Sequence, residues 1–151
     1  RYSENPYINA VVAANAAYAK HCGIRLESNV ELGAARLKTI EFCVILNDAL
    51  VYAIDRAGAA DTDDKLVRMT VTPLEGRITF EAVYSAPPQK KKRRALNAQS
   101  FNVWAASLLE PKAEEDAPQL ETVRGIIART SGTMNRSAAG GSEILRIVVN
   151  N

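Results

Sequence analysis

The chain has 151 residues, of which 47% are hydrophobic and 24% charged, and this suits one globular domain with a proper core. Its formal net charge of +2 gives no argument for a polyanionic partner, and its two cysteines are too few for a secreted disulfide scaffold. No apolar run approaches the roughly 20 residues that span a bilayer, and no signal peptide is visible. Because the chain starts at Arg1 without methionine, we expect it to be a fragment of something longer.

The first 60 residues predict a helix, a strand and a second helix. Asn5 is suited to cap the first helix, and Gly23 suits the left-handed backbone that ends it. Apolar and polar side chains alternate over residues 24–30, as in a half-buried strand. The second helix is expected to begin at Thr39 as its cap and to end at Gly58, with one apolar stripe facing the core.

The rest of the chain predicts two hairpins separated by a third helix. The expected ranges are 66–72 and 77–84 for the first hairpin, 119–130 for the helix, and 133–138 and 143–149 for the second hairpin. Helix, strand, helix, hairpin, helix, hairpin is the element order of an α/β two-layer sandwich. We therefore expect a mixed, mostly antiparallel sheet of about five strands with about three helices on one face.

Several stretches of the chain resemble one known family. They are Asn-Pro-Tyr-Ile-Asn-Ala-Val-Val from Asn5, the run Cys43–Ala57 in the second helix, the third helix from Leu120, and Gly-Gly-Ser-Glu-Ile-Leu-Arg-Ile-Val-Val from Gly140. Their order and spacing resemble the ATP-binding domain of sensor histidine kinases of the quorum-sensing, accessory-gene-regulator type, which has the GHKL (Bergerat) fold. The resemblance covers about residues 5–84 and 119–149.

The resemblance implies a function and a set of partners. The chain would be the C-terminal catalytic and ATP-binding domain of a two-component sensor histidine kinase, with ATP and Mg²⁺ as cofactors. Its partners would be an upstream dimerisation helix that carries the phosphoacceptor histidine and a response regulator, in a full-length homodimer. It would be a cytoplasmic domain of a membrane-anchored sensor, and no nucleic-acid partner is expected.

The second helix and the third strand depart from the family's nucleotide-binding pattern. In an ungapped comparison Tyr52 stands where the family has the asparagine that holds magnesium, and a neutral phenol is a poor ligand for that ion. Asp48 falls at the general-base position of related gyrase-like ATPases, and Asn47 lies one place away from it. Asp48, Tyr52 and Asp55 form one stripe along the helix, which is either a rebuilt polar pocket or an ordinary solvated helix face. Tyr84 stands where the family places the residue that recognises adenine.

The segment before the third helix also departs from the family. There the family has Gly-x-Gly-Leu, whose bare backbone N–H groups hold phosphate, whereas this chain has Asp116-Ala-Pro-Gln-Leu120 without a glycine. The carboxylates of Glu114, Glu115 and Asp116 would repel a triphosphate. By the resemblance, Leu120 stands at one of the family's nucleotide-pocket positions. The three departures together predict that nucleotide binding is damaged.

The sequence predicts a divergent lid-like insertion at residues 85–118 within a single domain of residues 1–151. The basic run 90–94 either contacts phosphates of a nucleotide or nucleic acid or is a solvated loop. Residues 95–109 have the spacing of an amphipathic helix that either packs over the nucleotide site or docks on a partner helix. Three functions stay open: a histidine kinase catalytic domain, a pseudo-ATPase that serves regulation or protein interaction, and, with less support, nucleic-acid binding through residues 90–94.

Overall fold

The computed structural model describes residues 2–33, 38–87 and 117–150, which form helices and strands in the predicted order. The helices are α1 (Pro6–His21), α2 (Thr39–Gly58), the short 3₁₀ helix η1 (Pro118–Leu120) and α4 (Glu121–Arg129). The strands are β1 (Arg25–Val30), β2 (Leu66–Leu74), β3 (Arg77–Ser85), β4 (Thr133–Ala139) and β5 (Ser142–Asn150).

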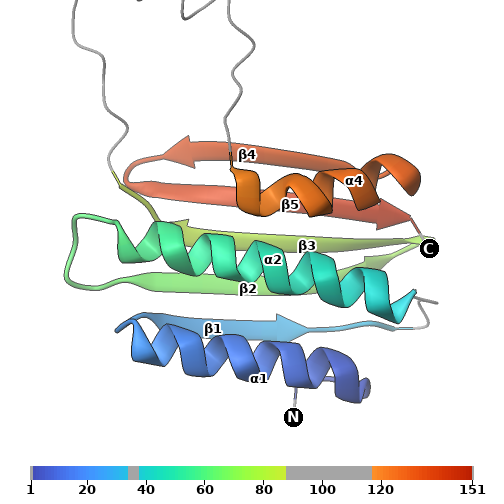
Figure 1. Ribbon diagram of the computed structural model, residues 1–151, viewed down its shortest axis with the longest axis horizontal. Coiled ribbons are helices and arrows are strands. Elements are labelled where there is room, and N and C mark those ends of the chain that lie inside the picture. The colour runs from blue at the N-terminus through green and yellow to red at the C-terminus, as the bar shows by residue number, and fades with distance from the viewer. Residues whose placement is uncertain (1, 34–37, 88–116, 151) are drawn as a thin grey trace, which may run out of the picture.

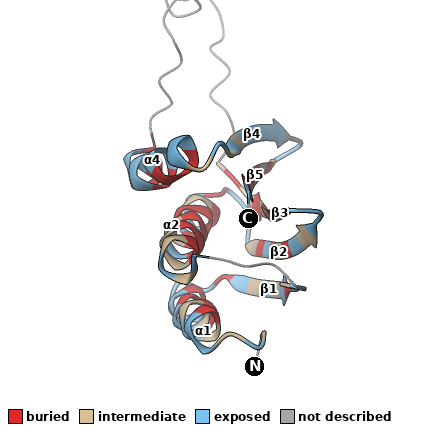
Figure 2. Cartoon of the chain, turned by 90° about the vertical axis from the view of Figure 1, so that its right-hand side faces the viewer, coloured by how far each residue is buried: buried red, intermediate tan, exposed pale blue. Residues whose placement is uncertain are grey.

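The strands form one mixed sheet in the order β1-β2-β3-β5-β4. The β1–β2 pair is parallel, because α2 crosses over between the two strands, and the other three pairs are antiparallel. Helices α1, α2 and α4 lie side by side on one face of this sheet (Figure 1), and the view along the layers shows helices on one side and strands on the other (Figure 2). The predicted two-layer sandwich with five strands and three main helices is confirmed.

The core lies between the helices and the inner face of the sheet. Strands β3 and β5 alternate strictly, so every second side chain is buried against the helices. The buried set on these two strands is Ile78, Phe80, Ala82 and Tyr84 with Glu143, Leu145, Ile147 and Val149. Helix α2 lies at the centre of the helical layer and contributes more buried residues than either neighbour (Figure 2). One member of the strand set, Glu143, is charged, and it identifies the polar cluster described below.

Most of the predicted boundaries are correct, and two differ for local reasons. The Asn5 side chain accepts hydrogen bonds from the backbone N–H groups of Tyr7 and Ile8, as a helix cap should. Thr39 is not the cap of α2: Lys38 precedes the helix and makes no side-chain cap bond. The third helix opens with the 3₁₀ turn η1 before α4 begins, and Leu120, the last residue of η1, is completely buried.

Several predicted features lie outside the described residues. These are the basic run 90–94, the amphipathic segment 95–109, and the carboxylates Glu114, Glu115 and Asp116. Among the helices in the described ranges, none combines the length and the apolar character needed to cross a membrane.

Candidate functional site

The structure brings two of the predicted nucleotide positions into direct contact. Tyr52 of α2 and Tyr84 of β3 are both buried, and their ring centroids lie 6.2 Å apart with the planes nearly perpendicular, at 88°. This is the edge-to-face arrangement that aromatic pairs prefer. Leu120, the third position, is fully buried in η1, which packs against α2. These three of the predicted positions therefore lie in the layer between α2 and its neighbours and face inward, whereas the other three, Asn47, Asp48 and Asp55, do not.

An ion pair borders the two tyrosines. Arg56, one helical turn after Tyr52, donates from Nε to Oε1 of Glu143 at 3.2 Å and from Nη2 to the other carboxylate oxygen. The β3–β5 register places Glu143 directly opposite Tyr84, so the carboxylate lies beside the buried ring. The hydrogen bond to Glu143 raises the pKa of the Arg56 guanidinium, and burial works against it. Glu143 is 8% exposed, so its carboxylate is largely desolvated, whereas Arg56 is partly exposed.

Arg136 of β4 contacts both the hydroxyl and the ring of Tyr52. Its Nη1 donates a hydrogen bond to the Tyr52 hydroxyl, and its guanidinium carbon lies 5.6 Å from the centroid of the same ring. The β4–β5 register pairs Arg136 with Leu145, whose side chain is buried on the inner face of the sheet. We call Tyr52, Tyr84, Arg56, Glu143 and Arg136 the tyrosine cluster. It joins α2 to three different strands.

The Tyr84 hydroxyl is the least well hydrogen-bonded polar group of the tyrosine cluster. It is buried without a well-formed hydrogen bond in the described part of the chain. Burial, and to a smaller extent the Glu143 carboxylate, raise the pKa of Tyr84 above its usual value. The phenol therefore stays neutral across the physiological range.

Removing the two tyrosine hydroxyls should have opposite consequences. Tyr84→Phe should leave the free energy of unfolding unchanged or raise it by up to about 1 kcal/mol, because a buried polar group without a well-formed bond is lost. Tyr52→Phe should lower it by about 1.5 kcal/mol, because the bond from the Arg136 guanidinium is lost. Urea unfolding of both variants measures this difference. A loss at Tyr84 equal to that at Tyr52 would contradict the assignment of bonds.

The polar residues Asn47, Asp48 and Asp55 do not join the tyrosine cluster. Asn47 is exposed and accepts a hydrogen bond at 3.0 Å from Nδ2 of Asn15, a buried residue of α1. Asp48 is half-buried and lies with Asn47 along a groove between α1 and α2. Asp55 is exposed and accepts a hydrogen bond from the Tyr18 hydroxyl at 2.5 Å. The three residues of the predicted stripe therefore do not share one pocket: Asp48 lines the groove, Tyr52 is buried, and Asp55 bonds to Tyr18.

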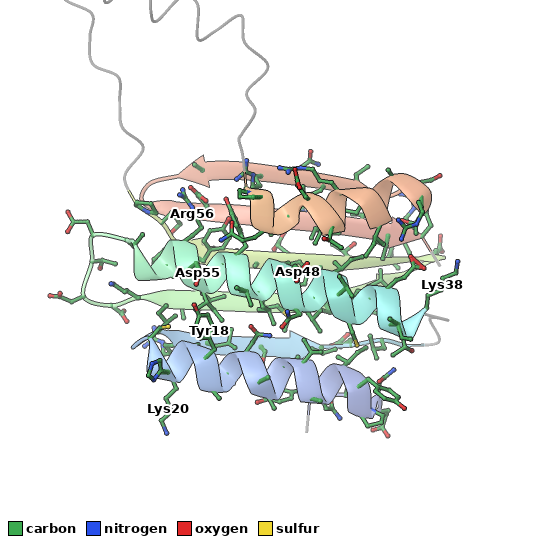
Figure 3. All side chains as sticks on the ribbon, in the orientation of Figure 1. Tyr18, Lys20, Lys38, Asp48, Asp55 and Arg56 are labelled. Carbon is green, nitrogen blue, oxygen red and sulfur yellow. The ribbon has the colours of Figure 1, made fainter. Side chains whose placement is uncertain are left out.

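A hydrogen bond between Tyr18 and Asp55 connects α1 to α2 near the C-terminal ends of the two helices. Figure 3 shows Tyr18 between the two helices and Arg56 on the other side of α2, toward the β4–β5 hairpin. The hydrogen bond to Asp55, followed by the charge of that carboxylate, raises the pKa of Tyr18 to about 12. Because the folded chain holds this proton more tightly than the unfolded chain does, the stabilisation is complete below pH 10. It is lost as the pH rises from about 10 to 12.

The link between Tyr18 and Asp55 is testable by alkaline titration. In the unmodified chain the phenolate absorbance of Tyr18 should appear near pH 12. In Asp55→Asn it should appear near pH 10, the ordinary value, because the charge that opposes ionisation is absent. Subtracting the titration of a Tyr18→Phe variant isolates this residue from the other tyrosines. An unchanged midpoint in Asp55→Asn would show that the carboxylate does not hold the proton.

Sequence reasoning identified Tyr52 and Tyr84 but missed Arg56, Arg136 and Glu143. Arg56 follows Tyr52 by one helical turn, which is the only local signal. Arg136 and Glu143 depend on strand register, which the sequence alone does not supply. Within residues 2–33, 38–87 and 117–150, no three His, Cys, Asp or Glu side chains are grouped closely enough to hold a metal ion.

Comparison with known proteins supports the fold and nothing finer. No protein-family model and no curated protein matches the chain. Among solved structures, the nucleotide-free catalytic domain of the histidine kinase ThkA is similar, with a TM-score of 0.66 and 12% identity over 97% of this chain and 91% of that one. The fold of this chain is therefore that of histidine kinase catalytic domains.

Two longer proteins contain the same fold. The histidine kinase domain of a blue-light activated histidine kinase from Erythrobacter litoralis EL346 has a TM-score of 0.65 and 11% identity, covering 95% of this chain and 58% of that one. Full-length ShkA in complex with AMPPNP has a TM-score of 0.61 and 16% identity, covering 95% of this chain. This chain spans only 29% of ShkA, so it corresponds to one part of that protein.

Proposed function

We propose that this chain is the catalytic-domain module of a two-component sensor histidine kinase whose nucleotide position is occupied by its own side chains. It would act as a pseudo-ATPase, in regulation or in contacts with the rest of a sensor protein. The observation that carries this proposal is the direct contact between Tyr52 and Tyr84. The fold supports the kinase ancestry, and the contact supports the loss of nucleotide binding.

The spacing of the two rings supports this proposal. By resemblance, magnesium would lie at the position of Tyr52 and adenine at that of Tyr84, so a bound nucleotide would have to pass between them. Tyr52 and Tyr84 are instead in direct contact, edge to face with their ring centroids 6.2 Å apart, so no space remains between them for the part of a nucleotide that joins the base to the phosphates.

The chemistry of the tyrosine cluster also argues against ATP and Mg²⁺. Magnesium prefers carboxylate, carbonyl and water oxygens, and a neutral phenol is a poor substitute. Glu143 is engaged by Arg56, and the Tyr52 hydroxyl accepts the bond from Arg136. The residues present do not fit the cofactor of the fold, so we derive no phosphoryl transfer through them.

The proposal places this module within a larger signalling protein. The partners would be an upstream dimerisation helix with a phosphoacceptor histidine and a response regulator. A module that keeps the sandwich but not the nucleotide could still contact those helices or hold a dimer. The coding sequence upstream of Arg1 tests this part: a phosphoacceptor helix there supports it, and an unrelated domain contradicts it.

Calorimetric titration with ATP and excess Mg²⁺ at low salt tests whether Tyr52 and Tyr84 prevent nucleotide binding. The unmodified chain should give no binding at about 1 mM nucleotide, which corresponds to less than about 4 kcal/mol. The double variant Tyr52→Asn and Tyr84→Asn should bind ATP weakly, with a Kd of about 1 mM or below, because it restores oxygen ligands and removes two rings. The single variant Tyr52→Asn should restore less, since Tyr84 still occupies the space.

A tyrosine outside the cluster supplies the control. Tyr18→Asn removes a phenol from the α1–α2 contact and should leave nucleotide binding absent. Circular dichroism should confirm that each variant is folded before titration. Tight ATP binding by the unmodified chain would contradict the pseudo-ATPase proposal. Failure of the folded double variant to bind would mean that these two rings are not what prevents binding.

A further inference from the structure

A groove on the helical layer lies between α1 and the N-terminal half of α2. Its volume is about 520 Å³, within the range of pockets that hold small organic molecules. Its lining consists of Tyr7 from α1 and of Thr39, Ile40, Cys43, Val44, Asn47 and Asp48 from α2. Tyr52, Arg56 and the strand residues of the tyrosine cluster are not part of this lining.

The walls of the groove are apolar and open to solvent. Tyr7 is 69% exposed and Ile40 is 81% exposed, and both are large hydrophobic side chains. Cys43 and Val44 continue this surface toward the core and are partly buried against it. Covering such side chains releases about 25 cal/mol for each Å² of apolar surface removed from water. The groove therefore favours an occupant with an apolar body.

The polar side of the groove is defined by Asp48. Within the described ranges the Asp48 carboxylate accepts one long hydrogen bond, at 3.5 Å from Nδ2 of Asn47. In the described part of the chain no cation lies within ion-pair distance of its carboxylate. Asp55 on the same helix differs, because the Tyr18 hydroxyl bonds to it at 2.5 Å. A half-buried carboxylate without a close donor complements a positive charge on the occupant.

We propose that the groove between α1 and α2 is a binding site for a small amphipathic organic cation. The apolar body would lie against Tyr7, Ile40 and Val44, and the ammonium group would donate to Asp48. This combination of apolar walls with one placed charged group is the usual composition of a small-molecule pocket. The site is separate from the tyrosine cluster, so it does not depend on the proposed loss of nucleotide binding.

Two probes that differ in charge test the site on the full 151-residue chain. The first is 2-(1-naphthyl)ethylamine, a cation at pH 7, and the second is 2-(1-naphthyl)ethanol, a neutral molecule of nearly the same shape. The amine should bind with a Kd of about 0.1–1 mM, as expected for a ligand of this size. The alcohol should bind about tenfold more weakly, because it cannot pair with the Asp48 carboxylate.

Two carboxylates on α2 provide a matched pair of variants. Asp48→Asn should weaken binding of the amine about tenfold and change binding of the alcohol little, because only the charged contact is lost. Asp55→Asn should change neither, since Asp55 lies outside the groove. Thermal unfolding of both variants should confirm that neither substitution has disrupted the helical layer.

The two cysteines report where the probe binds. Cys43 lines the groove, whereas Cys22 is exposed and lies outside it. Burial raises the pKa of the Cys43 thiol, so its alkylation by iodoacetamide is expected to be slower than that of Cys22. The amine should slow alkylation of Cys43 several-fold further and leave Cys22 unchanged.

Three results would overturn the proposal. These are equal affinity for the amine and the alcohol, no loss of affinity in folded Asp48→Asn, and binding without protection of Cys43. The absence of binding by the amine up to about 10 mM would also overturn it, because that is above the range expected for a built site. None of these results bears on the ATP titration, which depends on Tyr52 and Tyr84.

Discussion

Replacing Glu143 with alanine should lower the free energy of unfolding by about 3 kcal/mol, because it leaves the Arg56 guanidinium without its partner. The Arg56 side chain is 33% exposed and the Glu143 side chain 11% exposed, so water replaces the lost bonds only in part. The Tyr84 ring beside Glu143 would also lose a packing neighbour. Chemical denaturation of the unmodified chain and the variant measures the effect.

The outer face of the same strand pair provides the control. Glu81 of β3 pairs with Arg146 of β5, with side-chain exposures of 29% and 57%, so this pair is better solvated. Glu81→Ala should therefore cost about 0.5 kcal/mol. The double variant Arg56→Met and Glu143→Leu should recover most of the loss, because it removes both buried charges together. Equal costs for Glu143→Ala and Glu81→Ala would contradict the importance assigned to the buried pair.

Leu120→Ala should destabilise the fold by about 3 kcal/mol, the usual cost of truncating a fully buried leucine. Leu120 ends η1, and η1 packs against α2, so the cavity would open where α4 joins the helical layer. Leu120 is thus a core residue of the sandwich. The free energy of unfolding in urea measures the loss.

An exposed leucine provides the matched comparison for Leu120. Leu74, at the end of β2, is 66% exposed, and Leu74→Ala should change the free energy of unfolding by less than about 0.5 kcal/mol. Similar effects of the two leucine substitutions would mean that η1 does not anchor α4.

The fold could be predicted from the sequence because its signals are local. Asn5 caps α1, Gly23 has a φ of +74° just after it, and strict alternation of side chains defines β3 and β5. Gly140 and Gly141, with φ of +57° and +85°, form the turn of the last hairpin as predicted. Each feature depends on a few neighbouring residues, so tertiary contacts reinforce it instead of opposing it.

The local prediction was less accurate at helix starts. Thr39 has the side chain of a cap, but Lys38 precedes the helix in its place without a side-chain bond. The third helix was expected as one element, and the structure divides it into η1 and α4 at Leu120. Cap chemistry and a 3₁₀ turn both depend on how the preceding chain approaches the helix, and residue preferences describe that approach poorly.

The sequence by itself determined the element in which each tyrosine lies, Tyr52 in the second helix and Tyr84 in the third strand, because these assignments follow from local periodicity. Only the tertiary structure decided that the two rings touch and that Arg56, Glu143 and Arg136 surround them. Only the tertiary structure also showed that Asp48 and Asp55, which lie on one side of the helix, have different partners: Asp48 lines the groove and Asp55 bonds to Tyr18. The reason is physical: a helix period fixes the direction of a side chain, whereas its partners depend on the packing of α1 and on strand registers set far away in sequence.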